Sequence, residues 1–393
     1  MNKRSDNLLV AIAFLTFIGF GLSAGLMGVV WPSMREGFGI GDDAYGVLTL
    51  ATMICSLLVT AYSGALLARF GIGASLLTSC LFGGLGFLVS ILAPNWGTFV
   101  AIQGATAVGT ALLNPAINTY FATHESAGRM NWLHACWGLG ATISPTLMAW
   151  TLQAGGTWRA GYVMLGAINL ALAVVFSLTL KRWPQAVKEK KADETPARRS
   201  SRTLALPAVW LSLLLFLTFT GMESSTGQWS FTLFTEGRGI DAATAGMWIS
   251  VYYASITVGR VVFGVVVQKV RASSLMRLCM LGALLGAAAI WFAPLPAVGF
   301  AGLALAGFCL APLFPVLTST TPERLGAARA ATVIGYQITA VRLGLSLIPA
   351  LGGVLSEKMG VTSIGPFLFA VAATTFILHE ATLRGKMANS KSQ

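Results

Sequence analysis

The chain has 393 residues, of which 55% are hydrophobic and only 10% are charged, and its mean hydropathy is +0.74. A soluble globular protein carries about 25% charged residues, so this composition excludes an ordinary soluble domain and indicates a membrane protein. The formal net charge of +12 would suit a nucleic-acid partner, but the basic residues cluster at the ends of apolar runs, so we expect no nucleic-acid binding.

Twelve apolar runs are each long enough to cross a hydrocarbon core about 30 Å thick. In chain order they cover residues 8–31, 45–68, 72–93, 97–122, 130–153, 159–180, 204–234, 243–268, 274–293, 297–319, 329–355 and 362–382. The first run follows Lys3 and Arg4, as in a signal peptide, but it is too long for one, so we expect it to be retained. The sequence therefore predicts an all-α membrane protein with 12 transmembrane helices, surrounded by the lipid bilayer.

The charged residues between the runs predict the orientation. If the N-terminus is cytoplasmic, 20 of the 26 Lys and Arg residues lie on the cytoplasmic side, four lie outside and two lie within runs. This is the positive-inside pattern, and it predicts a multi-pass protein of the cell (inner) membrane with both termini in the cytoplasm. The five cysteines all fall within the runs at no metal-like spacing, so we expect packing residues rather than disulfides or metal ligands.

The polar segment 181–203 divides the runs into two sets of six. It predicts an N-terminal bundle over 1–180, a basic cytoplasmic linker over 181–203 and a C-terminal bundle over 204–393. The halves repeat at an offset near 200 residues: EGFGI at 36–40 matches EGRGI at 236–240, and GLGATISP, ending at Pro145, matches RLGLSLIP, ending at Pro349. Parallel six-helix repeats are typical of a transporter whose substrate binds near mid-membrane between the halves.

Four stretches carry a resemblance to a known family: NWLHACWGLGATISP (131–145), GMESSTGQW (221–229), YYASITVGRVVFG (252–264) and GFCLAPLFP (307–315). The chain resembles the major facilitator superfamily over essentially its whole length, and within it the fucose/glucose–cation symporter (fucose permease-like) family. The resemblance implies the major facilitator fold of two pseudo-symmetric six-helix bundles. The chain departs from the family in two places: Ala68 replaces an aspartate before Arg69, and runs 1 and 4 lack the coupling carboxylates of proton-coupled fucose permeases.

Polar residues inside the runs are the candidate substrate contacts, because they are costly in lipid and usually face a cavity or a partner. In the fourth run, Gln103, Thr110, Asn114 and Asn118 fall within a stripe of about 80°. Their amides match the hydroxyl groups of a sugar. The alternative is hydrogen bonding between helices. In the tenth run, Pro312 and Pro315 predict a hinged helix.

Glu223 is the only formal charge between Ala205 and Phe234. We expect it to be the coupling group, with Arg342 of the eleventh run either as its ion-pair partner or as the anchor of an anionic substrate. Arg260 shares a helical face with Tyr253 and is expected to act in gating. The full set of predicted site residues is Ser23 (at the repeat position of Glu223), Gln103, Asn114, Asn118, Trp137, Glu223, Gln228, Trp229 and Arg342 for substrate, Glu223 and Arg342 for coupling, and Arg69, His134 and Arg260 for gating.

These features predict a secondary active transporter of a small polar solute. The expected solute is a monosaccharide or sugar derivative, moved by cation symport with alternating access, with a proton or sodium ion as the coupling ion and no other cofactor. Two alternatives stay open: transport of a small organic or sulfonated anion bound by Arg342, and proton-coupled efflux of drugs or metabolites. The sequence contains no Walker A motif, metal-ligand pair or nucleophile arrangement, so we expect neither an enzyme nor an ATP-driven pump. The protein is expected to be a monomer.

Overall fold

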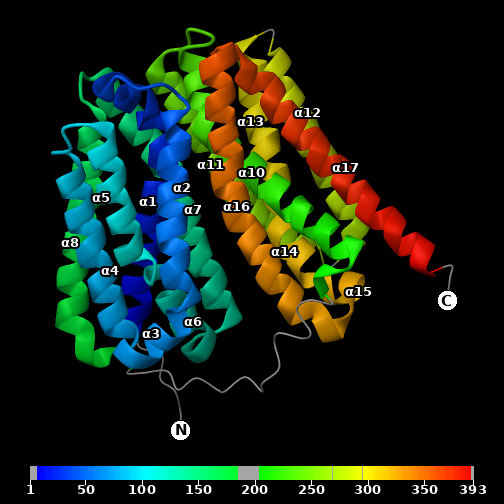
Figure 1. Cartoon of the computed structure of the whole chain (residues 1–393), viewed down its shortest axis with the longest axis horizontal. Helices are drawn as coiled ribbons and strands as arrows, with labels where there is room; N and C mark the ends of the chain where they lie inside the picture. Colours follow the sequence, from blue (N-terminus) through cyan, green and yellow to red (C-terminus); the bar gives the residue numbers. More distant parts are fainter. Residues whose placement is uncertain (1–6, 185–202, 268, 294, 391–393) are drawn as a thin grey trace. The chain divides into compact units, whose positions relative to one another are not determined.

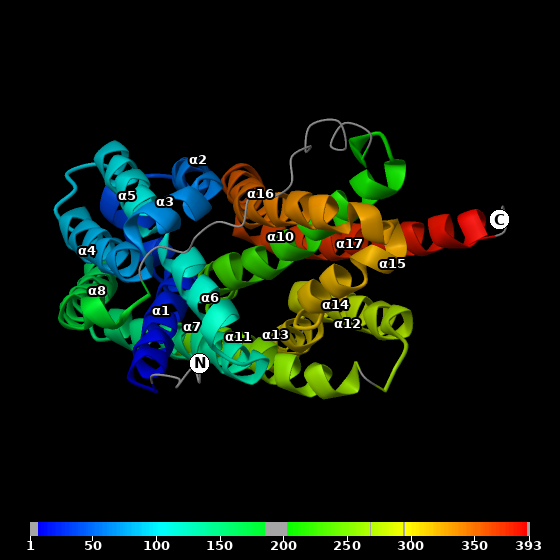
Figure 2. The same ribbon diagram turned by 90° about the horizontal axis from the view of Figure 1, so that it is seen from below.

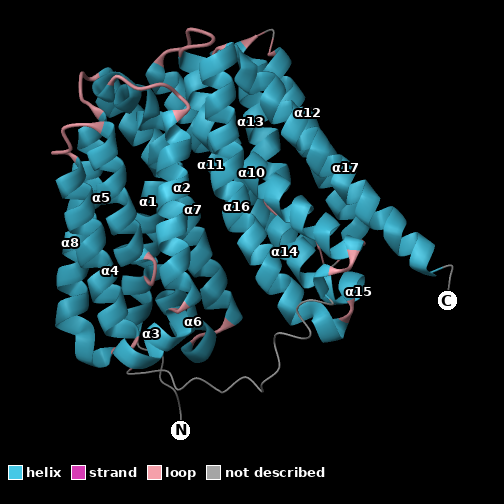
Figure 3. Cartoon of the chain, viewed as in Figure 1, coloured by secondary structure: helices cyan, strands magenta, loops and turns pink. Residues whose placement is uncertain are grey.

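The computed structural model describes residues 7–184, 203–267, 269–293 and 295–390. Within these ranges all regular secondary structure is helical (Figure 3). The chain divides into two compact units, residues 1–191 and 192–393, which run from blue to green and from green to red in Figure 1. Most of the basic linker predicted over 181–203 lies outside the described residues.

The helices of the first unit are α1 (Asn7–Phe38), α2 (Ala44–Ala61), α3 (Ser63–Phe70), α4 (Ile72–Ser90), α5 (Trp96–Thr110), α6 (Leu113–His124), α7 (Ala127–Gln153) and α8 (Trp158–Thr179), followed by the short 3-10 helix η1 (Leu180–Arg182). Those of the second unit are α10 (Pro207–Thr235), α11 (Ala242–Val266), α12 (Ala272–Phe292), α13 (Pro296–Leu310), α14 (Leu313–Ser319), α15 (Thr321–Leu325), α16 (Ala327–Met359), the 3-10 helix η2 (Val361–Ser363) and α17 (Ile364–Ser390).

In the described part of the chain, 11 helical segments are long and apolar enough to cross a membrane. They correspond to 11 of the 12 predicted runs, and the prediction of an all-helical membrane fold is confirmed. The remaining run, 130–153, is α7, a helix of 27 residues. Its first turns carry Arg129, Asn131 and His134, which lower its hydropathy, and it packs along α1 as part of the same bundle.

The same close helix contact occurs in both units. In the first unit α1 packs against α7, and in the second α10 packs against α16 (Figures 1 and 2). A Cβ atom at Gly140 of α7 would collide with the carbonyl oxygen of Ile18, and one at Gly344 of α16 would collide with that of Leu217. Gly344 lies 204 residues after Gly140, and Leu217 lies 199 residues after Ile18. The internal repeat is therefore visible as one contact made twice, with glycine allowing the backbones to approach.

The fourth and tenth predicted spans are each broken in the middle. The break between α5 and α6 falls at residues 111–112, and the break between α13 and α14 falls at 311–312. Pro115 and Pro315, three residues inside the second half-helices, lack the N–H groups that would bond to the carbonyls of Ala111 and Ala311. The tenth span is interrupted at the place where the prolines predicted a hinge. The break in the fourth span is additional, and its signal is the 200-residue spacing of the two prolines.

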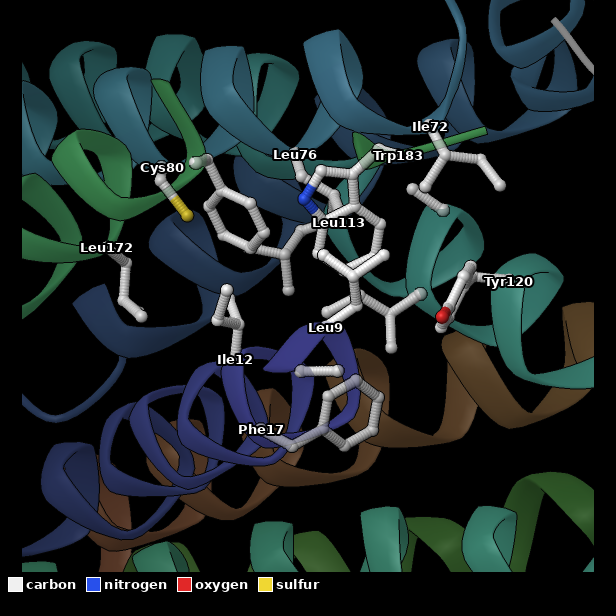
Figure 4. Close-up of a cluster of buried hydrophobic side chains, with 14 of the residues drawn as sticks. Leu9, Ile12, Phe17, Ile72, Leu76, Cys80, Leu113, Tyr120, Leu172 and Trp183 are labelled. Atoms are coloured by element: carbon white, nitrogen blue, oxygen red, sulfur yellow. The ribbon is translucent and has the colours of Figure 1, made fainter. Parts of the chain in front are cut away.

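A hydrophobic cluster in the first unit fixes the orientation of α6. The labelled members in Figure 4 come from α1, α4, α6 and α8 and from the segment after η1: Leu9, Ile12, Phe17, Ile72, Leu76, Cys80, Leu113, Tyr120, Leu172 and Trp183. The buried residues of α6 recur at helical spacing from Leu113 to Phe121 and form one apolar stripe. Asn114 and Asn118 consequently lie away from this stripe, on the accessible side of α6.

We predict that Gly140→Ala and Gly344→Ala each destabilise the protein by about 1–3 kcal/mol, because the new methyl group enters a space occupied by backbone. Thermal unfolding of the purified protein in detergent measures the effect. Gly264→Ala in α11 is the control, because a Cβ atom there meets nothing within 4 Å, and alanine in an open helical position is worth up to about 1 kcal/mol of stability. Equal stability of Gly140→Ala and Gly264→Ala would contradict the contact described here.

Candidate functional site

The accessible polar pair of the first unit is Asn114 and Asn118, at the start of α6. The Asn118 Nδ2 group donates to the carbonyl oxygen of Asn114 at 3.0 Å and also to the Asn114 side-chain oxygen. Asn114 is exposed and Asn118 is half-buried. The pair directly follows the break in the fourth span, where transporters commonly place polar groups for a ligand. Both residues stay candidates for contact with a polar solute.

The other half of the predicted stripe has a different role. Gln103 is only 8% exposed, and its Nε2 group donates to the Ser90 hydroxyl at the end of α4, at 2.8 Å. Thr110 also faces α4, where its methyl group lies against Gly83. The stripe is thus divided at the helix break: its α5 part joins two helices, and its α6 part is accessible. We therefore assign Gln103 to helix packing and no longer to substrate binding.

The remaining first-unit candidates occupy three different places. Trp137 is half-buried against the hydrophobic cluster, and the exposed His134 lies one turn earlier on α7 with its ring 5.7 Å from that of Phe17. Arg69 is exposed in the last turn of α3. His134 and Trp137 thus lie near the same cluster, whereas Arg69 lies on α3, and gating by His134 and Arg69 and substrate contact by Trp137 stay predictions.

Ser23 is half-buried and donates to the carbonyl oxygen of Phe20 in its own helix, at 2.8 Å. The helix contacts of the two units give an offset of 199 residues between α1 and α10, one less than the offset in the loops. Under this register the exposed Ala24, and not Ser23, occupies the position of Glu223. The first unit thus places a methyl group where the second places a carboxylate.

In the second unit, side chains of α10 donate to backbone carbonyls of α16. The three bonds are Thr220 Oγ1 to Val341 at 3.4 Å, Ser224 Oγ to Leu345 at 3.3 Å and Trp229 Nε1 to Pro349 at 2.9 Å. Pro349 has no N–H, so the Leu345 carbonyl loses its helical donor, and the Ser224 hydroxyl supplies a replacement. The equivalent carbonyl of the first unit is that of Ala141, which loses its helical donor to Pro145. Gly25, at the position equivalent to Ser224, has no hydroxyl to replace this donor, and its backbone packs directly against the carbonyl oxygen.

These contacts change the predicted roles of Gln228 and Trp229. Trp229 is 0% exposed, and a Cβ atom at Gly352 would lie 2.9 Å from its Nε1 atom, so the indole is enclosed between α10 and α16. It has no open face on which a sugar ring can stack. Gln228 is also buried. We therefore assign Trp229 to the helix interface and do not retain Gln228 as a direct substrate contact.

Glu223 lies beside Arg260 of α11. The Arg260 Nη2 atom is 3.9 Å from Glu223 Oε1, and the side chains are 37% and 21% exposed, respectively. In the described part of the chain, the ion pair of Glu223 is formed with Arg260 and not with Arg342. Of the two roles left open for Arg342, pairing with Glu223 is therefore taken by Arg260, which was expected only to act in gating. The long Arg260 side chain reaches along α11 toward Glu223. Because Arg260 and Tyr253 share a helical face, the sequence already contained a signal for this placement.

Two tyrosines complete the surroundings of Glu223. The Tyr252 hydroxyl donates to the backbone carbonyl of Glu223 at 2.8 Å. The Tyr253 hydroxyl lies against the backbone of Gly227, one turn after Glu223, where a Cβ atom would collide with it. The sequence reading missed these two phenols as site residues, although both stand in the stretch YYASITVGRVVFG.

Arg342 is half-buried on α16. At about 100° per residue, Glu223 points about 110° away from the α16-facing side of α10, and Arg342 points about 110° away from the α10-facing side of α16. The hydrogen bonds between the helices show that α10 and α16 run parallel. The two rotations have opposite senses, so in a pair of parallel helices that face each other they bring the Glu223 and Arg342 side chains to the same side of the pair. Glu223 and Arg342 thus flank one side of the α10–α16 contact, the side on which Tyr253 of α11 lies.

A helical membrane protein with an internal repeat, interrupted spans and an ion pair inside one bundle has the architecture of a membrane transporter. The family model described as Major Facilitator Superfamily matches residues 11–349 and 231–385. The chain belongs to the Major Facilitator Superfamily.

Two relatives align over most of this chain. An "Uncharacterized MFS-type transporter" of Pseudomonas aeruginosa is 25% identical over 389 residues, covering 93% of this chain and 90% of the relative. A "Gallate transporter" of Pseudomonas putida is 23% identical over 428 residues, covering 96% of this chain and 92% of the relative. Both span the whole helical region, so the similarity is not confined to one bundle.

Solved structures share the fold at low identity. The nucleoside transporter NupG superposes with a TM-score of 0.80 at 12% identity, covering 95% of this chain and 98% of that one. The Escherichia coli fucose:proton symporter FucP superposes with a TM-score of 0.62 at 16% identity, covering 96% and 99%. At these identities the likeness shows the fold alone, and it does not single out the fucose permease-like family within the superfamily.

We predict that Gln103 stabilises the protein without binding substrate. A double-mutant cycle of Gln103→Met and Ser90→Ala, measured by thermal unfolding, is expected to give a coupling of about 0.5–1.5 kcal/mol for the hydrogen bond. The Michaelis constant for uptake should stay unchanged in Gln103→Met and rise in Asn114→Ala, which removes an accessible amide. A rise in Gln103→Met as large as that in Asn114→Ala would return Gln103 to the substrate site.

Proposed function

We propose that this protein is a secondary active transporter that moves a monosaccharide or sugar derivative together with a cation by alternating access. The observation that carries the proposal is the Glu223–Arg260 ion pair between α10 and α11. An ionisable pair inside membrane spans is costly and is usually retained for function. In this proposal the protein is a monomer of the inner membrane with both termini in the cytoplasm, and the coupling ion is a proton or a sodium ion.

The geometry of the ion pair suits reversible coupling. Its separation of 3.9 Å exceeds the roughly 2.7–2.9 Å of a charge-assisted hydrogen bond. Glu223 can therefore accept a proton without first breaking a short hydrogen bond to Arg260. Neutralising the carboxylate removes the attraction between α10 and α11, because the two charges lie on different helices. A cation that binds Glu223 in only one conformation then shifts the balance between conformations.

The accessible polar groups suit a hydroxylated solute. The amides of Asn114 and Asn118 both donate and accept hydrogen bonds, as sugar hydroxyls do. In the second unit, the Glu223 carboxylate and the Tyr253 hydroxyl add an acceptor and a group that can do both.

We predict that purified protein in proteoliposomes accumulates a sugar from a panel when a proton or sodium gradient is imposed. Glu223→Gln should abolish gradient-driven accumulation and retain counterflow, in which solute exchanges across the membrane without net cation movement. Glu36→Gln, an exposed acid in the last turn of α1, is the matched control and should behave as wild type. Full accumulation by Glu223→Gln would end the proposed coupling role.

The charges of the second unit favour a second candidate, transport of a small organic anion. Arg260 and Arg342 accompany one carboxylate, Glu223, so these three groups carry an excess of one positive charge. An arginine binds a carboxylate or sulfonate through two parallel hydrogen bonds. The relative from Pseudomonas putida is named a gallate transporter, and gallate is a hydroxylated aromatic carboxylate.

We predict that Arg342→Lys separates the two solute classes. If the substrate is an organic acid, lysine cannot reproduce the bidentate contact, and the affinity should fall by about tenfold or more. If the substrate is a neutral sugar, the Michaelis constant should change little. Uptake of sugars and organic acids by the wild type and Arg342→Lys proteins decides between them. Accumulation only when the cation gradient is reversed would instead favour the efflux alternative.

A further inference from the structure

The last third of α10 holds an unusual concentration of buried polar side chains. Thr235, the last residue of the helix, donates to the carbonyl of Phe231. Thr220, besides its longer contact with Val341, donates to the carbonyl of Phe216. Five other groups are buried without a hydrogen-bond partner among the described residues: the hydroxyls of Ser225, Thr226, Ser230 and Thr232 and the Nε2 group of Gln228. A buried polar group without a protein partner is usually satisfied by internal water.

One side of α10 connects two of these groups, Thr226 and Ser230, to the Glu223 carboxylate. At about 100° per residue, Glu223, Thr226, Gly227 and Ser230 fall within an arc of about 100°. Ser230 is fully buried, and Thr226 lies beside the phenol of Tyr252. Ser225, Gln228 and Thr232 belong to the opposite side of the helix. Hydroxyl groups thus recur along one face from Ser230 to Glu223.

Helix α11 adds two hydroxyls to this face. The Tyr252 hydroxyl bonds to the Glu223 carbonyl, and the Tyr253 hydroxyl sits against Gly227. The charged groups on this side of α10 are Arg260 of α11, which pairs with Glu223, and Arg342 of α16. Because Ser230 and Thr226 are a helical turn apart, about 6 Å along the axis, a bridging water is needed to link their oxygens.

We propose that Ser230, Thr226 and the two tyrosine hydroxyls hold a short chain of water molecules that carries protons to Glu223 from the C-terminal end of α10, the end that the charge pattern predicts to face outside. The step is a transfer of hydrogen-bonded protons. A proton enters at the water beside Ser230, each oxygen passes one proton onward, and the Glu223 carboxylate becomes a carboxylic acid. No electron moves and no other reactant is consumed.

This proposal rests on the coupling role of Glu223, and it selects the proton as the coupling ion. It also explains why residue 227 is a glycine. Without a side chain at residue 227, the Tyr253 hydroxyl reaches the helix backbone between Thr226 and Glu223, where it extends the line of hydroxyls. Phe234 is fully buried one turn beyond Ser230, so a proton reaches Ser230 from this end only when the packing around Phe234 opens.

The test uses full-length protein in proteoliposomes that enclose a pH-sensitive dye, with an imposed proton gradient and the transported solute. We expect Ser230→Ala and Thr226→Val to slow solute-dependent proton entry by about tenfold or more, as loss of a positioned proton-transfer group does. Counterflow should keep its wild-type rate. Ser230→Thr retains a hydroxyl and should restore proton entry.

Ser225→Ala and Thr232→Val are the matched controls, because they remove unpaired buried hydroxyls from the opposite side of the same helix. They should leave both proton entry and counterflow unchanged. Wild-type proton entry in Ser230→Ala and Thr226→Val would overturn the water chain, and so would equal slowing by the controls. If Glu223→Gln itself retains gradient-driven accumulation, the coupling role fails as well, so the two failures are distinguishable.

Discussion

Inside a bilayer, a backbone carbonyl that loses its helical donor cannot bond to water instead and needs a donor from the protein. This constraint determines how the helices of the second unit pack. Pro349 deprives Leu345 of its donor, and the Ser224 hydroxyl supplies another from the neighbouring helix. Together with Thr220 and Trp229, this bond sets the register between α10 and α16. The register in turn determines which residues of α10 face α16 and which, like Glu223, face the side where the charges and phenols meet.

The same constraint explains how much the sequence could predict. Proline spacing and apolar run length are local properties, so the spans, the repeat and the hinge at Pro312 and Pro315 were all readable. The break at residues 111–112 was equally marked by Pro115, but a stripe drawn through it assumed an uninterrupted helix. That assumption placed Gln103 on the same surface as Asn114. Because of the break, α5 packs on α4 through Gln103, while the Asn114 and Asn118 amides of α6 stay accessible.

The charged site shows a different limit. Helical phase placed Arg260 and Tyr253 on one face, yet Arg260 was expected to act in gating and not beside Glu223. An arginine side chain spans several residues of helix, so the depth of its Cα atom does not locate its guanidinium group. Trp229 illustrates the reverse case: its neighbours Glu223 and Gln228 suggested a binding surface, but only the position of the Pro349 carbonyl shows that the indole is enclosed.

The repeated helix contact differs in chemistry between the two units. In the first, Gly21 and Gly25 press against the carbonyls of Trp137 and Ala141; at the equivalent positions of the second, Thr220 and Ser224 hydrogen-bond to the carbonyls of Val341 and Leu345. Both units keep the close approach at Gly140 and Gly344, and the second unit adds hydroxyl-to-carbonyl hydrogen bonds along it. The α10–α16 contact is therefore held by directional bonds as well as by close fit, and its axial alignment is fixed more narrowly than shape alone would fix it.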